Sequence, residues 1–191
     1  MPEQQPAIAT QYRVEETTIG EIHEAMRGGT LSAADLVECY LRRIDAYDQA
    51  GPKINCIVNI NENARERAAE LDDAFARAGE FTGPLHGIPV LVKDCIETND
   101  ATTTFGNIAF AQYRPKSDAT VVRKVREAGA IILAKTNMSE FASGVTMSSV
   151  GGMIRNPHDL ARTPSGSSGG TGAAIAASTL LRVVSRTLSG R

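Results

Sequence analysis

The sequence of 191 residues predicts an α/β fold built around a mixed or parallel sheet. Two observations carry this prediction. Segments with helical periodicity alternate with short, continuous apolar runs of strand length, and the two strongest runs, residues 88–92 and 131–133, each follow such a helical segment. Hydrophobic residues make up 42% and charged residues 22%, which is the balance of an ordinary globular domain rather than of a disordered chain.

The first third of the chain contains three expected helices. Thr17 or Thr18 can cap the first of them, which Gly28 and Gly29 would end. Ser32 and the aspartate three residues later resemble a capping box for the second helix, whose apolar residues recur at helical spacing. The third helix is expected from residue 62 to 77, because this stretch is rich in Ala, Glu and Arg and carries a narrow apolar stripe.

The expected strands are short and lie between these helices. Residues 54–58 alternate apolar and polar side chains, which indicates a strand. The apolar run at 88–92 indicates a buried strand that ends at Lys93. A helix is expected at 118–127, a second buried strand at 131–133, a helical turn at 137–141 and an Ala-rich helix at 172–177.

Charge and composition exclude several classes of function. Lys and Arg number 20 against 22 Asp and Glu, with no long basic tract, so a nucleic-acid partner is not expected. The N-terminus lacks the pattern of a signal peptide and no run of 18 apolar residues occurs, so we expect a cytoplasmic protein with no membrane segment. Cys39, Cys56 and Cys95 form no C-x-x-C pair, so they are expected to be core or surface thiols rather than ligands of a metal.

A Gly/Ser-rich stretch at residues 165–172 runs directly into the Ala-rich helix. Such a loop can cradle a phosphate, but no lysine follows the glycines and the dinucleotide pattern is not matched. The other interpretation is that the loop holds the hydroxyls of Ser167 and Ser168 near a base. Lys93 is the candidate base, because burial at the strand end disfavours an ammonium ion. The alternative for Lys93, which the lysine alone favours, is a head group that reaches solvent beside a neighbouring carboxylate.

Four blocks of sequence, in order along the chain, then resemble one family. They are residues 83–94 around Lys93, residues 130–141, residues 155–164, and the Gly-Ser-Ser-Gly-Gly signature at 166–170. Together they cover about residues 17–178 and resemble the amidase signature family. The resemblance implies a mixed-sheet amidase-signature fold flanked by helices, and hydrolysis of the C–N bond of a small-molecule linear amide with no cofactor and no metal.

The resemblance also implies a Ser-cisSer-Lys triad. Lys93 would accept a proton from Ser167, and Ser167 would relay a proton from a second serine that attacks the amide carbonyl. Ser167 would be the cis serine after Gly166, and Ser168 would support Lys93 by a hydrogen bond. Ser165 departs from the family pattern, which usually has Gly there.

The nucleophile of the family lies in a later stretch resembling Gly-Thr-Asp-x-x-Gly-Ser, and that place falls here at Arg191. The family pattern is lost after about residue 178. We therefore expect an N-terminal tail at 1–16, the N-terminal part of an amidase domain at 17–178, and an aberrant segment at 179–191. Reading each codon one base earlier can turn residues 183–191 into Gly-Gly-Val-Thr-Asp-Thr-Leu-Gly-Ser, which indicates a reading-frame slip unless the match is a coincidence.

The sequence thus predicts a truncated amidase-signature hydrolase that lacks its nucleophile and is inactive. Two alternatives stay open. A residual hydrolase would use a dyad of Ser167 and Lys93, and a non-catalytic module would use the Gly/Ser loop to bind an anion. The particular amide and the oligomeric state are not predicted by the sequence.

Overall fold

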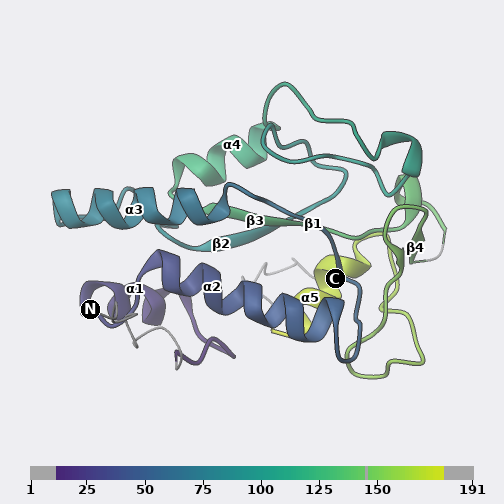
Figure 1. Ribbon diagram of the computed structural model, residues 1–191, viewed down its shortest axis with the longest axis horizontal. Coiled ribbons are helices and arrows are strands. Elements are labelled where there is room, and N and C mark those ends of the chain that lie inside the picture. The colour runs from purple at the N-terminus through teal and green to yellow at the C-terminus, as the bar shows by residue number, and fades with distance from the viewer. Residues whose placement is uncertain (1–11, 145, 179–191) are drawn as a thin grey trace, which may run out of the picture.

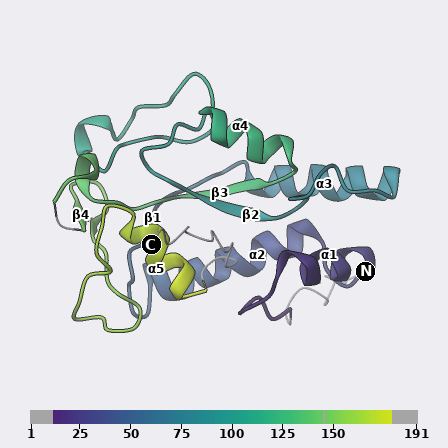
Figure 2. The same ribbon diagram turned by 180° about the vertical axis from the view of Figure 1, so that it is seen from behind.

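A computed structural model describes residues 12–144 and 146–178. Its main sheet has three strands in the order β1-β3-β2, with β1 antiparallel and β2 parallel to β3. Helix α4 covers one face of the sheet, and α2 and α5 cover the other (Figures 1 and 2). The segments 1–11 and 179–191 lie outside the described residues, and so do the expectations for most of the N-terminal tail and for the aberrant segment.

The elements follow one another in an alternation of helices and strands. The helices are α1 (Ile19–Arg27), α2 (Ala33–Arg43), α3 (Ala64–Ala78), α4 (Thr120–Glu127) and α5 (Gly169–Ala176), with a π-helix η1 (Ile44–Gln49) and the 3-10 turns η2 (Ile108–Phe110) and η3 (Glu140–Ala142). The strands are β1 (Ile57–Ile60), β2 (Pro89–Lys93) and β3 (Ile131–Thr136), and a separate hairpin is formed by β4 (Met147–Ser148) and β5 (Gly152–Met153). The mixed α/β class predicted from the sequence is confirmed.

The helix starts agree with the local sequence. Thr18 caps α1 and Ser32 caps α2, and each forms a complete capping box with the acidic residue three positions later. Gly79 ends α3 in the left-handed conformation, at φ 71°. Glycine adopts this conformation easily because it has no Cβ that would clash with the backbone. These signals act within one turn of the chain, which is why the sequence alone locates them.

The first expected strand is displaced along the chain. Residues 54–58 were expected to form it, but β1 spans Ile57–Ile60. Asn55 adopts a positive φ of 59°, so a strand cannot run through it, and its side chain instead donates a hydrogen bond to the carbonyl of Met153 at 3.0 Å. The interactions of Asn55 with a distant hairpin therefore override the local alternation.

The strand expected to be fully buried at 88–92 is only partly so. In β2, Val90 and Leu91 are half-buried, whereas every residue of β3 is buried. The reason is position in the sheet, because β3 lies in the middle and β2 pairs with β3 alone among the described residues. An apolar run does not by itself distinguish an edge strand from a central one.

An irregularity in the pairing of β2 with β3 decides which side chains face which layer. Val90 pairs with Ile132 but Leu91 pairs with Ala134, so β3 contains one extra residue at this point. Beyond it, Val92 pairs with Lys135 and Lys93 pairs with Thr136. Because strand side chains alternate, each pair faces the opposite side of the sheet from the other.

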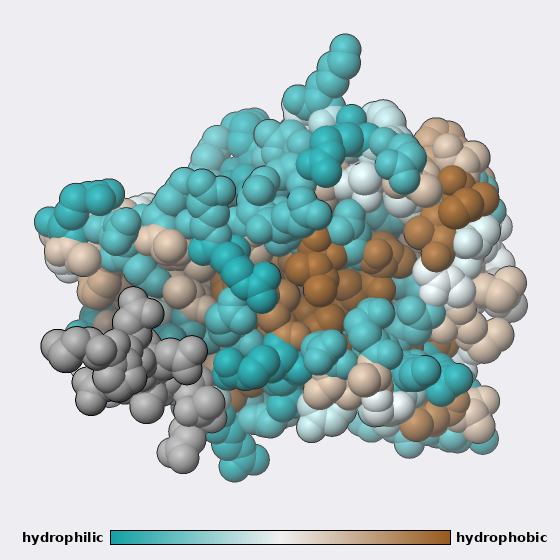
Figure 3. Space-filling model, viewed as in Figure 1, coloured by the Kyte–Doolittle hydropathy of each residue, from teal (hydrophilic) through white to brown (hydrophobic). Residues whose placement is uncertain are grey.

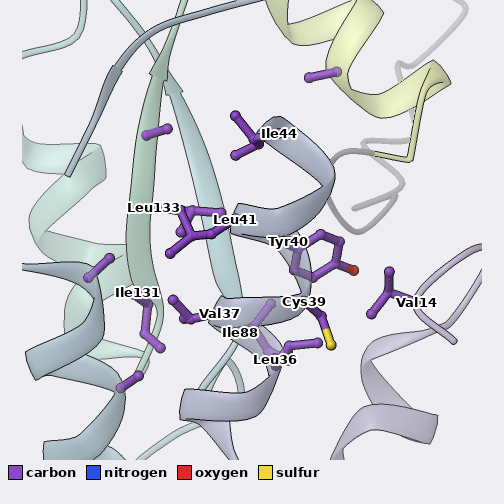
Figure 4. Packing of buried hydrophobic residues seen from close by; sticks show 14 of the residues in the cluster. Val14, Leu36, Val37, Cys39, Tyr40, Leu41, Ile44, Ile88, Ile131 and Leu133 are labelled. Carbon is purple, nitrogen blue, oxygen red and sulfur yellow. The ribbon is translucent and has the colours of Figure 1, made fainter. Parts of the chain in front are cut away.

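The main hydrophobic core lies between the sheet and α2. Figure 4 shows Val37 and Leu41 of α2 beside Ile131 and Leu133 of β3, while Tyr40 points to the other side of α2, towards Val14. A second, smaller cluster fills the other face, where Val92, Val122 and Ile132 are buried together under α4. Cys39 and Cys56 are buried thiols, as the sequence indicated for core cysteines.

Two further expectations differ from the structure in their bounds. The helical turn expected at 137–141 is instead η3 at Glu140–Ala142, and Phe141 within it has a positive φ of 47°. The Ala-rich helix begins at Gly169, three residues earlier than the expected 172. Among the described residues no helix is both long and apolar enough to cross a membrane.

Candidate active site

The candidate site forms where β2 ends. Lys93 is the last residue of β2, and its side chain points to the sheet face that α5 covers. There its amine donates a hydrogen bond to the hydroxyl of Ser167, with 2.6 Å between Nζ and Oγ. The two residues are 74 positions apart in the sequence, so it is the fold that brings them together.

The loop that carries Ser167 packs against the segment that directly follows β3. The peptide bond between Gly166 and Ser167 is cis. The carbonyl of Ser167 accepts a hydrogen bond from the backbone N–H of Ser139 at 3.1 Å. A side chain at Gly166 would collide with the hydroxyl of Ser139, so glycine is required for this approach.

Helix α5 packs against the sheet backbone to backbone. The N–H of Gly170 donates to the carbonyl of Asn137 at 3.1 Å. A Cβ on Gly170 would lie 2.7 Å from the carbonyl oxygen of Cys56 and would also collide with the backbone of Asn137. At the next residue of α5, the hydroxyl of Thr171 lies 2.8 Å from that of Thr136. Gly166 and Gly170 of the Gly/Ser stretch therefore serve close packing, which fixes the position of Ser167 just before the helix.

Ser168 does not take the place that the sequence suggested for it. Its side chain is exposed, and its carbonyl accepts the N–H of Gly172 at 3.1 Å inside α5. Within the described part of the chain, no hydrogen bond joins Ser168 to Lys93. The structure thus brings Ser167, rather than Ser168, to the lysine amine.

A second lysine, which the sequence analysis did not single out, lies on the opposite face. Lys135 of β3 is fully buried, and its amine donates to the carbonyl of Ile96 at 2.8 Å and to the hydroxyl of Thr103 at 2.7 Å. Asp94, also fully buried, has an oxygen 3.8 Å from the same amine. Burial lowers the pKa of Lys135 to about 8, and the nearby carboxylate of Asp94 acts in the other direction.

Asn137 is another residue that the sequence analysis did not single out. Its side-chain amide donates to the carbonyl of Asn55 at 3.0 Å, and its side-chain oxygen accepts from the hydroxyl of Ser148 at 2.9 Å. It therefore connects the segment before β1 and the β4–β5 hairpin to the residues that directly follow β3. The only sequence signal for either residue was membership of the block at 130–141, since contacts between distant segments leave no local pattern.

An aromatic patch lies beyond the turn that follows β2. It consists of Phe105, Phe110, Tyr113 and Phe141, whose rings contact one another with centroids 5.7 to 6.4 Å apart. Phe110 and Phe141 are exposed. In Figure 3, which has the view of Figure 1, brown apolar surface lies near the centre of the molecule, and a smaller brown area lies towards its right-hand end.

The chemistry available at the site is proton transfer between an amine and a hydroxyl. An amine in contact with a serine hydroxyl can remove a proton from it when the amine is neutral. Within residues 12–144 and 146–178, no group of three His, Cys, Asp or Glu side chains lies close enough to hold a metal ion. Among these residues, no other serine hydroxyl is hydrogen-bonded to the hydroxyl of Ser167.

Comparison with known proteins finds relatives over most of the chain. The model of the Amidase family matches residues 35–182. The chain is 42% identical over 161 residues to a glutamyl-tRNA(Gln) amidotransferase subunit of Halorhodospira halophila, covering 84% of this chain and 32% of that protein. It is 43% identical over 150 residues to the corresponding subunit of Salinispora arenicola, covering 78% and 30%. The chain thus spans about a third of the length of these curated relatives.

Solved structures give the same result for the fold. The native peptide amidase of Stenotrophomonas maltophilia is similar with a TM-score of 0.83 and 40% identity, covering 87% of this chain and 35% of that one. An amidase family protein of Bacillus anthracis is similar with a TM-score of 0.82 and 34% identity, covering 87% and 34%.

Proposed function

Since the chain belongs to the Amidase family of amidase-signature enzymes, we propose that Lys93 and Ser167 are the proton-relay half of a Ser-cisSer-Lys centre that hydrolyses the C–N bond of a linear amide. The observation that carries the proposal is the contact of 2.6 Å between the Lys93 amine and the Ser167 hydroxyl. Gly166 supports the centre by allowing the loop to approach Ser139.

In the proposed reaction the neutral amine of Lys93 accepts the proton of Ser167. Ser167 in turn takes the proton of a second serine, whose oxygen attacks the amide carbonyl. The proton then returns along the same relay to the leaving amine as the C–N bond breaks. Water completes hydrolysis of the acyl group on the second serine.

We further propose that the 191-residue chain, by itself, does not turn over amides. Its residues after Ser167 contain no serine in a Gly-Thr-Asp-x-x-Gly-Ser context. Losing one oxyanion-hole donor alone costs a factor of about 10² to 10³ in rate, and the loss of a nucleophile removes nearly all catalysis beyond binding effects. The reading-frame slip and the cytoplasmic location remain predictions of the same kind.

The test measures ammonia release by the purified chain from a simple carboxamide and from a peptide amide. We expect no turnover. Turnover that both Lys93→Ala and Ser167→Ala abolish would instead support the Ser167/Lys93 dyad and would contradict the proposed inactivity. Sequencing the coding DNA past codon 191 tests the frame slip. If the shifted frame is present, a chain built from it should be active, and both substitutions should abolish that activity.

A further inference from the structure

The ammonium of Lys135 is built into the turn that follows β2. Its hydrogen bonds go to the carbonyl of Ile96 at 2.8 Å and the hydroxyl of Thr103 at 2.7 Å, with the carbonyl of Thr102 at 3.4 Å. These groups belong to one loop, and the lysine side chain enters it from the neighbouring strand. The Lys135 amine therefore links three oxygen atoms of this loop to one another and limits the movement of its backbone.

The turn held by Lys135 is the turn that begins at Lys93. The N–H of Ile96 donates to the carbonyl of Lys93 at 2.9 Å, and the N–H of Asp94 donates to the carbonyl of Thr136 at 3.1 Å. The direction in which the Lys93 side chain leaves the strand end depends on these two bonds. The donor of the first bond is Ile96, and the carbonyl of Ile96 in turn accepts a hydrogen bond from the Lys135 amine.

Asp94 connects the same amine to the rest of the loop. One of its carboxylate oxygens accepts the N–H groups of Thr104 at 3.2 Å and Gly106 at 3.3 Å. The other oxygen has no hydrogen-bond partner among the described residues, and Lys135 is the cation near it, at 3.8 Å. A buried carboxylate without a nearby cation is strongly unfavourable. Removing the charge of Lys135 would therefore disturb Asp94, the residue that directly follows Lys93.

We propose that Lys135 is a positioning residue, which acts through Asp94 and the Lys93–Ile96 turn to hold the Lys93 amine against Ser167 from the opposite face of the sheet. The catalytic meaning of this inference rests on the proposed function of Lys93. Lys135 itself does not face the reacting groups, because its side chain and that of Lys93 leave the sheet on opposite sides.

The experiment follows the reactivity of individual lysines in the folded chain. The chain contains five lysines, of which Lys53, Lys116 and Lys124 are exposed and serve as internal references. Each amine is acetylated with a small amine-reactive ester for a short time, and the rate at each position is read by peptide mass spectrometry. This readout needs no turnover. A purely structural role for Lys135 would change all rates together, through unfolding.

Lys135→Met keeps the length of the side chain and removes its charge. We expect the acetylation rate of Lys93, relative to Lys53, to rise severalfold while circular dichroism stays native. The matched control, Lys124→Met, removes an exposed lysine and should leave the Lys93 rate unchanged. If Lys135→Met does not fold, the double variant with Asp94→Asn leaves no unpaired buried charge, and it should show the same rise at Lys93.

Ser167→Ala separates this inference from the proposed function. If Ser167 holds the amine, Ser167→Ala also raises the Lys93 rate. No rise with Ser167→Ala would count against the proposed catalytic pair, whatever Lys135→Met does. A rise with Ser167→Ala but an unchanged Lys93 rate in folded Lys135→Met, or in the folded double variant, would overturn the positioning role of Lys135 and leave the proposed pair intact.

Discussion

The two faces of the β2–β3 pair each hold a lysine, and the two lysines have opposite surroundings. On the face covered by α5, the amine of Lys93 is partly exposed and meets a serine hydroxyl. On the other face, the amine of Lys135 is fully buried and is surrounded by backbone carbonyls, a threonine hydroxyl and Asp94. Lys93 is therefore only half-buried beside a single hydroxyl, whereas the amine of Lys135 is enclosed by several polar groups of one loop.

The difference depends on one extra residue in β3. The irregularity between the pairs Val90–Ile132 and Leu91–Ala134 shifts the alternation of side chains. Without it, Lys135 would follow Ile131 and Leu133 onto the face of the main core, where no polar loop could take its charge. The extra residue in β3 thus places the buried side chain of Lys135 against the turn that begins at Lys93.

The largest effect, on the stability and self-association of the chain, is expected from the edge of the sheet that β2 forms. Among the described residues β2 pairs with β3 alone and its Val90 and Leu91 are half-buried, so it offers unpaired backbone groups beside apolar side chains. We predict that the isolated 191-residue chain is poorly stable and self-associates. Size-exclusion chromatography and thermal melting measure this. A monomer with a sharp cooperative transition would contradict the prediction.

The second prediction tests the close packing of α5 on the Lys93 face. Gly170→Ala places a Cβ against the backbone of Asn137 and Cys56, neither of which can move without moving its strand. We expect a loss of about 3 kcal/mol in the free energy of unfolding, the upper part of the range for overpacked cores. Urea unfolding measures it.

Gly172→Ala is the matched control on the same helix. A Cβ at Gly172 would meet nothing within 4 Å. The substitution should therefore stabilise α5 by about 0.5 to 1 kcal/mol, the usual advantage of Ala over Gly in a helix. Equal effects of the two substitutions would show that α5 is not packed as described.

The parts of the fold that the sequence predicted are those set by local signals. The caps at Thr18 and Ser32 and the buried strand β3 agree with the structure because a few neighbouring residues determine them. A contact between Lys93 and a hydroxyl of the Gly/Ser loop was one of two interpretations that the residues left open, and the resemblance to a family favoured it with Ser167. Composition and periodicity alone favoured a solvent-directed Lys93.

The parts that were missed depend on contacts between distant segments. The β4–β5 hairpin is connected to Asn55 and Asn137, from two other parts of the chain, and neither residue type by itself indicates such a role. Lys135 follows an apolar run as Lys93 does, so the sequence gives both lysines the same pattern. Only the extra residue in β3 and the loop above it separate their environments.

The third prediction concerns the buried charge of Lys135. Burial lowers its pKa from 10.5 to about 8. Between these values the unfolded chain binds a proton that the folded chain does not, so the free energy of unfolding should rise with pH, by at most about 1.4 kcal/mol per pH unit. The useful window is about pH 8 to 9, because burial raises the pKa of Cys39 above 9.0 and stability from that thiol is lost at higher pH.

Lys135→Met isolates this contribution. The urea concentration at the unfolding midpoint should increase from pH 7 to pH 8 and pH 9 in the parent chain. In the variant, the midpoint should stay the same over this range. The same slope in both proteins would show that another group causes it. An increase of stability with pH would show that the buried charge of Lys135 lowers the stability of the folded chain. The proposed positioning of the turn after Lys93 is a separate role of the same charge.

The smallest effect is expected at Ser165, in the loop that leads to Ser167. Ser165 has a φ of 64°, in the left-handed region that costs a residue with a side chain roughly 1 to 2 kcal/mol. Ser165→Gly removes this cost but gives the unfolded chain more freedom, worth roughly 0.5 to 1 kcal/mol. The net expectation is a gain of about 0.5 kcal/mol, or a rise of about 1 to 2 °C in the thermal midpoint.

Ser168→Gly is the control, because Ser168 has a φ of −92° that any residue adopts, so glycine there should lower the midpoint. A rise with both substitutions would mean that flexibility of the loop, rather than the conformation of Ser165, determines stability on the Lys93 face.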